Sequence, residues 1–244
     1  MHKIVPNISV DCVIFGFDFK QLNVLLVERK LVDEKTGEIL IDDWTLAGYH
    51  IFDDEDFDTA AARILKNLSG LDNIYLEQFY AFGGINRIDN PKDKIWVQHQ
   101  HEDFSERVVT VGYYSLIDNT SVTLSLKERN VKWFPVSNLP ELGFDHQEIL
   151  NKALEKLRSK IRSEPIGFEL LPEKFSITHL QKLYESILGT NLDRRNFRKK
   201  VLQMKYIIPL DEKQTGVKHK PAQLFLFSKD VYERTKRERF DFTI

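Results

Sequence analysis

The stretch DRRNFRKKVLQMK, residues 193–205, decides how the C-terminal third of the chain is interpreted. Its apolar residues Phe197, Val201 and Leu202 follow helical spacing, which predicts that they face inward. Asp193 is a typical residue to cap the start of such a helix. The remaining face carries five cations, which are Arg194, Arg195, Arg198, Lys199 and Lys205. On an isolated helix such a face is usually only solvated, so its meaning depends on the neighbouring elements.

The elements around this basic helix follow a defined order. Thr178 begins a predicted helix that Gly189 ends, and its apolar stripe consists of Leu180, Leu183, Tyr184, Ile187 and Leu188. After the basic helix, residues 207–210 and 223–227 are predicted as strands. The loop between them holds Lys213, Gly216, Lys218, His219 and Lys220. A helix, a short turn, a basic helix and a hairpin with a basic tip form the order of a winged helix-turn-helix.

This order assigns candidate DNA contacts, because the second helix of such a motif enters the major groove. The candidates are Arg194, Arg195, Asn196, Arg198 and Lys199 on the helix and Lys218 and Lys220 in the hairpin, with a structural role as the alternative for Asn196. Residues 168–244 contain 16 Lys and Arg against 10 Asp and Glu, a net charge of +6, and residues 1–167 carry −8. A basic module behind an acidic body favours a polyanionic partner.

Composition excludes several classes of protein. The chain has 244 residues, of which 42% are hydrophobic and 30% are charged, so it is neither collagen-like nor wholly disordered. No apolar run approaches the roughly 18 residues of a membrane span, and the first residues lack a signal-peptide core. Cys12 is the only cysteine, which excludes an intrachain disulfide and a multi-cysteine zinc site. We expect a soluble cytoplasmic protein without a membrane partner.

The N-terminal part alternates predicted strands and helices. A hairpin covers residues 8–30 with its turn at residues 18–21, and further strands cover residues 77–81, 107–117 and 131–134. Helices are expected at residues 59–68 and from the capping box at residues 145–148 onward. The second helix has an apolar stripe of Ile149, Leu150, Ala153, Leu154, Leu157 and Ile161, which fits either domain packing or a dimer interface. A break at residues 163–167 divides the chain into domains 1–163 and 164–244.

The segment from Trp44-Thr45-Leu46-Ala47-Gly48 to Gly70 resembles the Nudix motif, in which a Gly opens a loop–helix–loop and an Arg-Glu-x-x-Glu-Glu-x-Gly stretch closes it. This resemblance implies an α/β fold, an α/β/α sandwich with a mixed sheet, in front of the winged helix. In Nudix hydrolases the glutamates of that stretch hold magnesium ions, which neutralise a diphosphate and activate water.

The expected carboxylates are missing from this helix. Counted back from Gly70, Arg63 fills the arginine position, but Ile64, Asn67 and Leu68 stand at the glutamate positions. Counted forward from Gly48, those positions hold Arg63, Lys66 and Asn67. We therefore predict no catalytic residue, no metal site, no cofactor and no enzymatic activity. The acidic run Asp53, Asp54, Glu55, Asp56 and Asp58 either binds a cation or, as we expect, caps the helix.

Motifs along nearly the whole chain, about residues 8–230, resemble the Nudix-related bacterial transcriptional regulators, the NrtR-like family. They lie at residues 133–136, 143–146, 166–172, 180–185, 193–200 and 220–225. The resemblance implies a metabolite-sensing domain and a winged helix that binds a palindromic operator as a homodimer. The chain looks most similar to the arabinose-responsive AraR branch, which implies a repressor of sugar utilisation with L-arabinose as effector, or else ADP-ribose.

The effector pocket has only candidates. An aromatic face and paired polar groups are typical of sugar sites, and Trp44, Tyr49 and His50 surround Gly48 while Glu77 and Arg107 begin nearby strands. For each residue a core or structural role is the alternative. Two other functions remain open for the whole chain: a Nudix hydrolase acting on ADP-ribose or a related nucleoside diphosphate, and a protein-interaction module that binds no duplex DNA.

Overall fold

The fold was analysed in a computed structural model, which describes residues 3–69, 75–100, 107–119, 130–216 and 220–235. The chain divides into two compact units. Unit 1 comprises residues 1–16, 23–116 and 122–155, and unit 2 comprises residues 17–22, 117–121 and 156–244. The division by contacts thus assigns the turn of the first hairpin to unit 2. The boundary between residues 163 and 164 stays a prediction.

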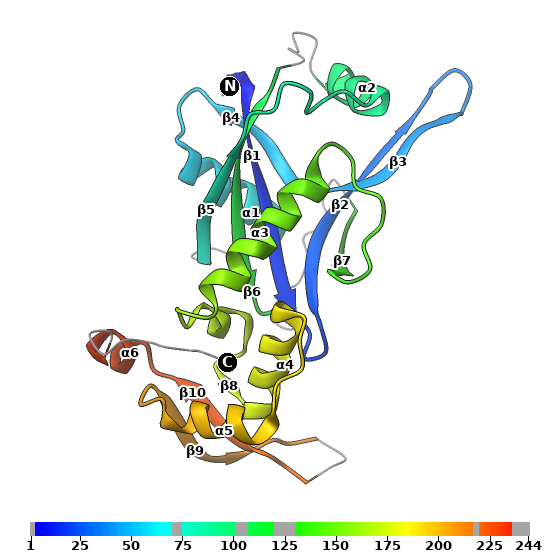
Figure 1. Ribbon diagram of the computed structural model, residues 1–244. Coiled ribbons are helices and arrows are strands. Elements are labelled where there is room, and N and C mark those ends of the chain that lie inside the picture. Colours follow the sequence, from blue (N-terminus) through cyan, green and yellow to red (C-terminus); the bar gives the residue numbers. More distant parts are fainter. Residues whose placement is uncertain (1–2, 70–74, 101–106, 120–129, 217–219, 236–244) are drawn as a thin grey trace. The chain divides into compact units, whose positions relative to one another are not determined.

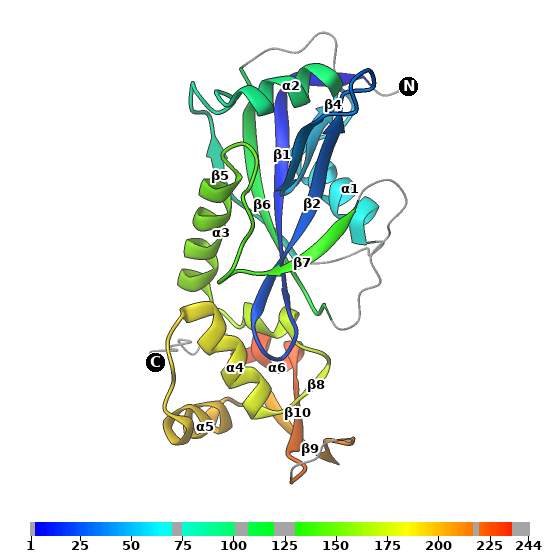
Figure 2. The same cartoon turned by 90° about the vertical axis from the view of Figure 1, so that its right-hand side faces the viewer.

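Unit 1 is built on a seven-stranded sheet with the order β3-β2-β1-β6-β5, in which β4 also pairs with β1 and β7 with β2. Its elements are β1 (Ile4–Phe17), β2 (Leu22–Val32), β3 (Ile39–Thr45), β4 (Ala47–Phe52), α1 (Phe57–Ser69), β5 (Tyr75–Phe82), α2 (Pro91–Gln100), β6 (Val109–Ile117), β7 (Val131–Pro135) and α3 (His146–Lys160). Figures 1 and 2 show α1 and α3 on opposite sides of this sheet. The arrangement is the predicted α/β/α sandwich.

Burial explains why the sheet forms where it does. Residues 12–15 of β1 and residues 24–26 of β2 are fully buried, since both strands lie in the middle of the sheet with a helix over each face. On α3, the apolar stripe is buried by the chain itself, with exposures of 0–8%. Of the two interpretations of that stripe, packing within the chain is therefore confirmed, and the stripe is not available to a second copy.

In its described residues, unit 2 combines three α-helices and one 3-10 helix with a small sheet. Its elements are η1 (Ile166–Leu170), β8 (Lys174–Phe175), α4 (Ile177–Leu188), α5 (Arg194–Gln203), β9 (Ile207–Lys213), β10 (Gln223–Phe227) and α6 (Lys229–Thr235). The sheet has the order β8-β10-β9. Tyr184 of α4, Phe197 and Val201 of α5 and Phe225 of β10 are buried, so helices and hairpin share one core. None of the helices in the described part of the chain is long and apolar enough to cross a membrane.

The helix boundaries confirm two predicted caps and correct others. Gly189 adopts the left-handed conformation, with φ 67°, at the end of α4, and the Asp193 carboxylate accepts a hydrogen bond from Asn196 N at the start of α5, as predicted. The start of α4 was predicted two residues too late, because Ser176 rather than Thr178 caps it by accepting from His179 N. In the predicted capping box of α3, the Asp145 carboxylate binds the Arg87 guanidinium.

Leu202 was wrongly assigned to the inner face of α5. Its side chain is 52% exposed, whereas Phe197 and Val201 are buried. Successive helical residues are about 100° apart, so the residue after Val201 lies outside the narrow stripe that Phe197 and Val201 form. The helix also ends at Gln203, which places Lys205 beyond it.

Candidate functional site

The cations of α5 lie on an exposed face and are not paired with the residues that the structure describes. Arg194, Arg195, Arg198, Lys199 and Lys200 are all exposed. Their side chains make no hydrogen bond or ion pair with any residue that the structure describes. Because Phe197 and Val201 anchor the opposite side of the helix, the charged side chains are held toward solvent. A compact run of unpaired cations on a fixed helix is suited to bind a polyanion.

The turn before α5 is fixed by hydrogen bonds from α4. Gln181 Nε2 donates to Glu185 Oε1 at 2.9 Å and to the Leu192 carbonyl at 3.0 Å, and Leu192 N donates to Glu185 Oε1 at 2.9 Å. These bonds pair both backbone groups of Leu192 in the turn between the two helices. The two side chains therefore set the position of α5 relative to α4.

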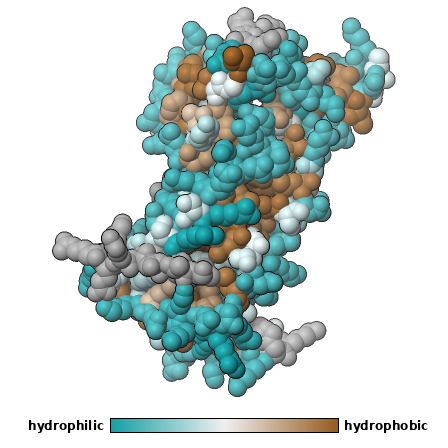
Figure 3. Space-filling model, viewed as in Figure 1, coloured by the Kyte–Doolittle hydropathy of each residue, from teal (hydrophilic) through white to brown (hydrophobic). Residues whose placement is uncertain are grey.

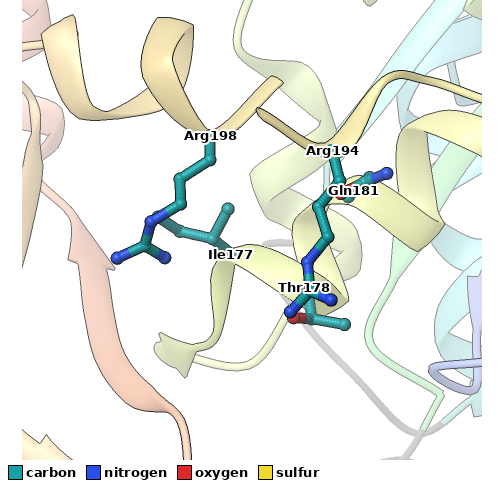
Figure 4. Close-up of a pocket in the computed structure, with 5 residues that line it drawn as sticks. All are labelled: Ile177, Thr178, Gln181, Arg194 and Arg198. Atoms are coloured by element: carbon teal, nitrogen blue, oxygen red, sulfur yellow. The ribbon is translucent and has the colours of Figure 1, made fainter. Parts of the chain in front are cut away.

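A notch of about 170 Å³ lies between these two helices. It is lined by Ile177, Thr178 and Gln181 from α4 and by Arg194 and Arg198 from α5. Figure 4 shows both arginine side chains extending from α5 toward the start of α4, where Ile177 and Thr178 lie. Sequence analysis named the two arginines but missed the three residues of α4. Had Ser176 been recognised as the residue that caps α4, Ile177 and Thr178 would have been placed in the first turn of this helix.

The hairpin after α5 carries the other predicted contacts. Strands β9 and β10 are antiparallel, with Phe225 opposite Pro209. Lys220 is exposed in the segment before β10, and Lys218 lies outside the described residues. Asn196 is exposed on α5, and its backbone N–H is the donor to the capping Asp193. Figure 3 shows hydrophilic side chains covering the visible surface of α5 and of this hairpin.

In unit 1, by contrast, the region that resembles the Nudix motif has its charges paired. Arg63 of α1 donates to Glu55 Oε2 at 2.9 Å and to the His50 carbonyl at 3.1 Å, and its guanidinium lies 4.1 Å from the centre of the Phe52 ring. The hydrogen bond from Arg63 lowers the pKa of Glu55. Ile64, at one glutamate position, is buried. Arg63 is thus held by its own chain.

The acidic run before α1 serves the local fold. Asp56 accepts from Thr59 N at the start of the helix, Asp58 accepts from the Tyr113 hydroxyl, and Asp53 accepts from Lys3 N. The bond to Thr59 is a typical helix cap. Within the described residues, no group of three or more His, Cys, Asp or Glu side chains is arranged to hold a metal ion. The geometry favours the capping interpretation of this run.

The five predicted effector contacts lie at four separate places along unit 1. Trp44 of β3 packs edge-on against Phe134 of β7. Tyr49 and His50 are neighbours on β4, with ring centres 6.1 Å apart. Glu77 of β5 accepts hydrogen bonds from the hydroxyls of Tyr75 and Tyr114, and exposed Arg107 donates to the Gly84 carbonyl. The set of five therefore stays a prediction.

A buried network of charges lies beside the Gly48 turn, and sequence analysis missed it. Arg29 is 1% exposed and binds Asp43 and Asp93, each at 2.6 Å. The Asp11 carboxylate lies against Gly48, where a Cβ would be only 2.0 Å from Asp11 Oδ1. His146 Nδ1 accepts a hydrogen bond from Leu46 N at 2.9 Å. These contacts explain why a glycine stands at position 48 and tie the loop to α3.

Known proteins resemble this chain over both units. Residues 167–227 match the family described as the NrtR DNA-binding winged helix domain. The chain is 29% identical over 233 residues to the ADPR responsive transcriptional repressor NtrR of Acinetobacter baylyi, which covers 93% of this chain and 84% of that protein.

Solved structures give the same picture. Shewanella oneidensis NrtR, crystallised with a 27mer DNA, has a TM-score of 0.68 and 26% identity and covers 93% of this chain and 95% of that chain. A MutT/nudix family protein from Enterococcus faecalis has a TM-score of 0.64 and 22% identity over 92% of this chain and 88% of its own, which shows likeness of fold alone. The chain is a Nudix-like mixed α/β domain followed by a C-terminal winged helix, as predicted, and these matches support the resemblance to NrtR-like regulators.

Proposed function

We propose that this chain is a DNA-binding transcriptional repressor whose Nudix-like domain binds ADP-ribose and thereby weakens operator binding. One observation carries the proposal: the unpaired cations of α5 lie within residues 167–227, which match the NrtR DNA-binding winged helix. Residues 1–163 are the proposed sensing domain and residues 164–244 the DNA-binding domain.

ADP-ribose now precedes L-arabinose as the proposed effector. The relative from Acinetobacter baylyi is named for its response to ADPR, and it aligns over both units of this chain. A role in sugar utilisation and L-arabinose as effector stay predictions, which none of the reported matches supports. The residues Trp44, Tyr49, His50, Glu77 and Arg107 remain the proposed effector contacts.

We further propose that the domain senses without hydrolysing. Ile64 and Asn67 supply no charged oxygen ligand where magnesium would be bound, and Arg63 and Glu55 are engaged with each other. The alternative, a hydrolase of ADP-ribose with displaced ligands, predicts magnesium-dependent release of AMP. Turnover of about 1 per second or more would overturn the proposal, since typical enzymes reach that rate.

The operator is proposed to be palindromic and the repressor a homodimer. One recognition helix covers few base pairs, and two-fold proteins read two half-sites spaced by whole turns of the duplex. The stripe on α3 is buried within the chain, so the dimer interface must lie elsewhere. Sedimentation equilibrium of the free protein and of its DNA complex tests this. A monomer in both states at micromolar concentration would contradict it.

The central experiment is a gel shift of the full chain with the duplex upstream of its own gene. A scrambled duplex of the same length is the control for specificity. ADP-ribose, AMP and L-arabinose are added in separate arms, each with EDTA so that hydrolysis cannot consume the ligand. We expect specific binding that ADP-ribose weakens about 5- to 150-fold, the usual range of allosteric coupling. Unchanged operator affinity in the presence of ADP-ribose would overturn the proposed effector, and lack of duplex binding the proposed repressor.

A further inference from the structure

We propose that the notch between α4 and α5 holds one backbone phosphate of duplex DNA, while the neighbouring face of α5 contacts the groove. This inference rests on the proposed DNA-binding function and divides the cations of α5 between two tasks. Arg194 and Arg198 are assigned to the phosphate, together with the Thr178 hydroxyl. Arg195 and Lys199 are assigned to the groove.

The division follows from helix geometry. Residues four apart lie on the same side of a helix, and adjacent residues lie about 100° apart. Arg194 and Arg198 share the side that faces α4, and both line the notch. Arg195 and Lys199 share the next side around the helix and are exposed without lining it. The two pairs therefore point in different directions from one helix.

The chemistry of the notch fits a phosphodiester. Its two guanidinium groups lie four residues apart and have no ion-pair partner among the described residues, so they repel each other unless an anion lies between them. Guanidinium and hydroxyl groups both donate hydrogen bonds to phosphate oxygens. The nearby carboxylates of Glu185 and Asp193 accept from Leu192 N and Asn196 N and do not line the notch.

The size of the notch fits a phosphate group and is too small for a base pair. About 170 Å³ accommodates a phosphate group with its ester oxygens but not a base pair, whose edges stay inside the groove. Ile177, which is buried, and Gln181, whose amide donates to Glu185 and to the Leu192 carbonyl, also line the notch. Gln181 is thus a positioning residue that fixes the distance between the two walls.

Phosphate contacts and base contacts have different signatures in binding. A lost phosphate contact weakens binding to every sequence equally and lowers the salt dependence, whereas a lost base contact relaxes specificity. Arg198→Ala is therefore expected to weaken operator and scrambled duplex by the same factor, about tenfold, and to reduce the salt slope by about one. Thr178→Val is expected to weaken both about threefold. Arg195→Ala is expected to weaken the operator more than the scrambled duplex.

The decisive test combines Arg198→Ala with single neutral methylphosphonate substitutions along the operator. We expect one position per half-site at which the substitution weakens the wild-type protein about tenfold but weakens Arg198→Ala clearly less, because the variant has already lost one of the three donors to that phosphate and keeps only Arg194 and Thr178. Circular dichroism controls for folding of each variant. Additive losses at every position, or an Arg198→Ala change in the operator-to-scrambled ratio above about threefold, would overturn the assignment. Failure of the wild-type chain to bind any duplex would instead overturn the proposed function, and the notch with it.

Discussion

Two helices of this molecule carry arginines in opposite situations. Arg63 of α1 is enclosed by Glu55, the His50 carbonyl and the Phe52 ring. Arg194 and Arg198 of α5 have no such partners among the described residues and border an open notch. An enclosed guanidinium already donates its hydrogen bonds to groups of its own chain, so few donors remain for a ligand. An unpaired charge at a fixed position keeps its full capacity to bind one.

The difference separates structural charges from functional ones better than residue type does. Arg29 is the extreme case, since it is 1% exposed and bound by two carboxylates on β3 and α2. In the α1 region, Ile64 is buried and Arg63 is paired with Glu55. On α5, the same residue types have been left available. Substitutions in the two regions should therefore affect different properties, stability in the first and DNA affinity in the second.

The largest expected effect is on stability. Arg29→Leu leaves Asp43 and Asp93 without their shared guanidinium, and breaking a buried ion pair by removing one partner costs about 3–5 kcal/mol. Urea unfolding of the full chain measures it. Lys152→Leu, which breaks an exposed pair with Glu155, is the matched control and should change the unfolding free energy by less than about 1 kcal/mol. Equal effects of the two substitutions would mean that the buried Arg29 pairs contribute no more to stability than the exposed Lys152–Glu155 pair.

The second expected effect is on operator affinity, with stability unchanged. The combined substitution of Arg194, Arg195 and Arg198 by Ala should weaken operator binding at least about 100-fold, since each contact of this kind is worth about 1–3 kcal/mol. The melting temperature should stay within a few degrees, because no pairing within the described chain is lost. A folded triple variant that binds the operator undiminished would refute the assignment of α5.

Features that depend on neighbouring residues could be predicted from the sequence, and features that depend on distant residues could not. Two local signals were interpreted correctly, the caps at Gly189 and Asp193, which depend only on neighbouring residues, whereas the cap of α4 was placed at Thr178 instead of Ser176. The Arg29 network was not foreseeable, because its partners lie 14 and 64 residues away and charged residues are usually exposed. Helix α2 was missed because it has no clear apolar stripe. The notch was missed because it requires the start of α4 and the side of α5 together.

A third, smaller effect concerns the pair between Arg63 of α1 and Glu55, which precedes this helix. Glu55→Gln keeps the shape of the side chain but removes the charge that holds Arg63, so we expect a loss of about 1–2 kcal/mol in unfolding free energy. Operator affinity in the absence of ADP-ribose should remain unchanged. The control is Glu155→Gln on the surface of α3. If Glu55→Gln leaves stability unchanged, the Arg63–Glu55 pair does not stabilise the fold. The Glu55 carboxylate would then again be a candidate cation ligand.

The smallest expected effect is the pH dependence from His146. Burial lowers the pKa of this imidazole below its ordinary value near 6.5, although Asp11 and Asp145 act in the opposite direction. In the folded state the ring is therefore neutral, which agrees with Nδ1 accepting a hydrogen bond from Leu46 N. In the unfolded chain the ring takes up a proton as the pH falls below about 6.5. The unfolded state then binds more protons, so the stability present above pH 6.5 is lost progressively as the pH falls toward the folded pKa.

This pH effect is measurable by urea unfolding at pH 7.5 and 5.5. We expect the unfolding free energy of His146→Gln to fall less than that of the wild-type chain between these two conditions, because only in the wild-type chain does unfolding let this ring take up a proton. His99→Gln, at an exposed position on α2, controls for removal of a histidine as such. If His146→Gln does not fold, an NMR titration of the wild-type imidazole replaces it. A ring that is half protonated at pH 6.5 in the folded protein would contradict the assignment of His146 as a neutral acceptor in the buried network.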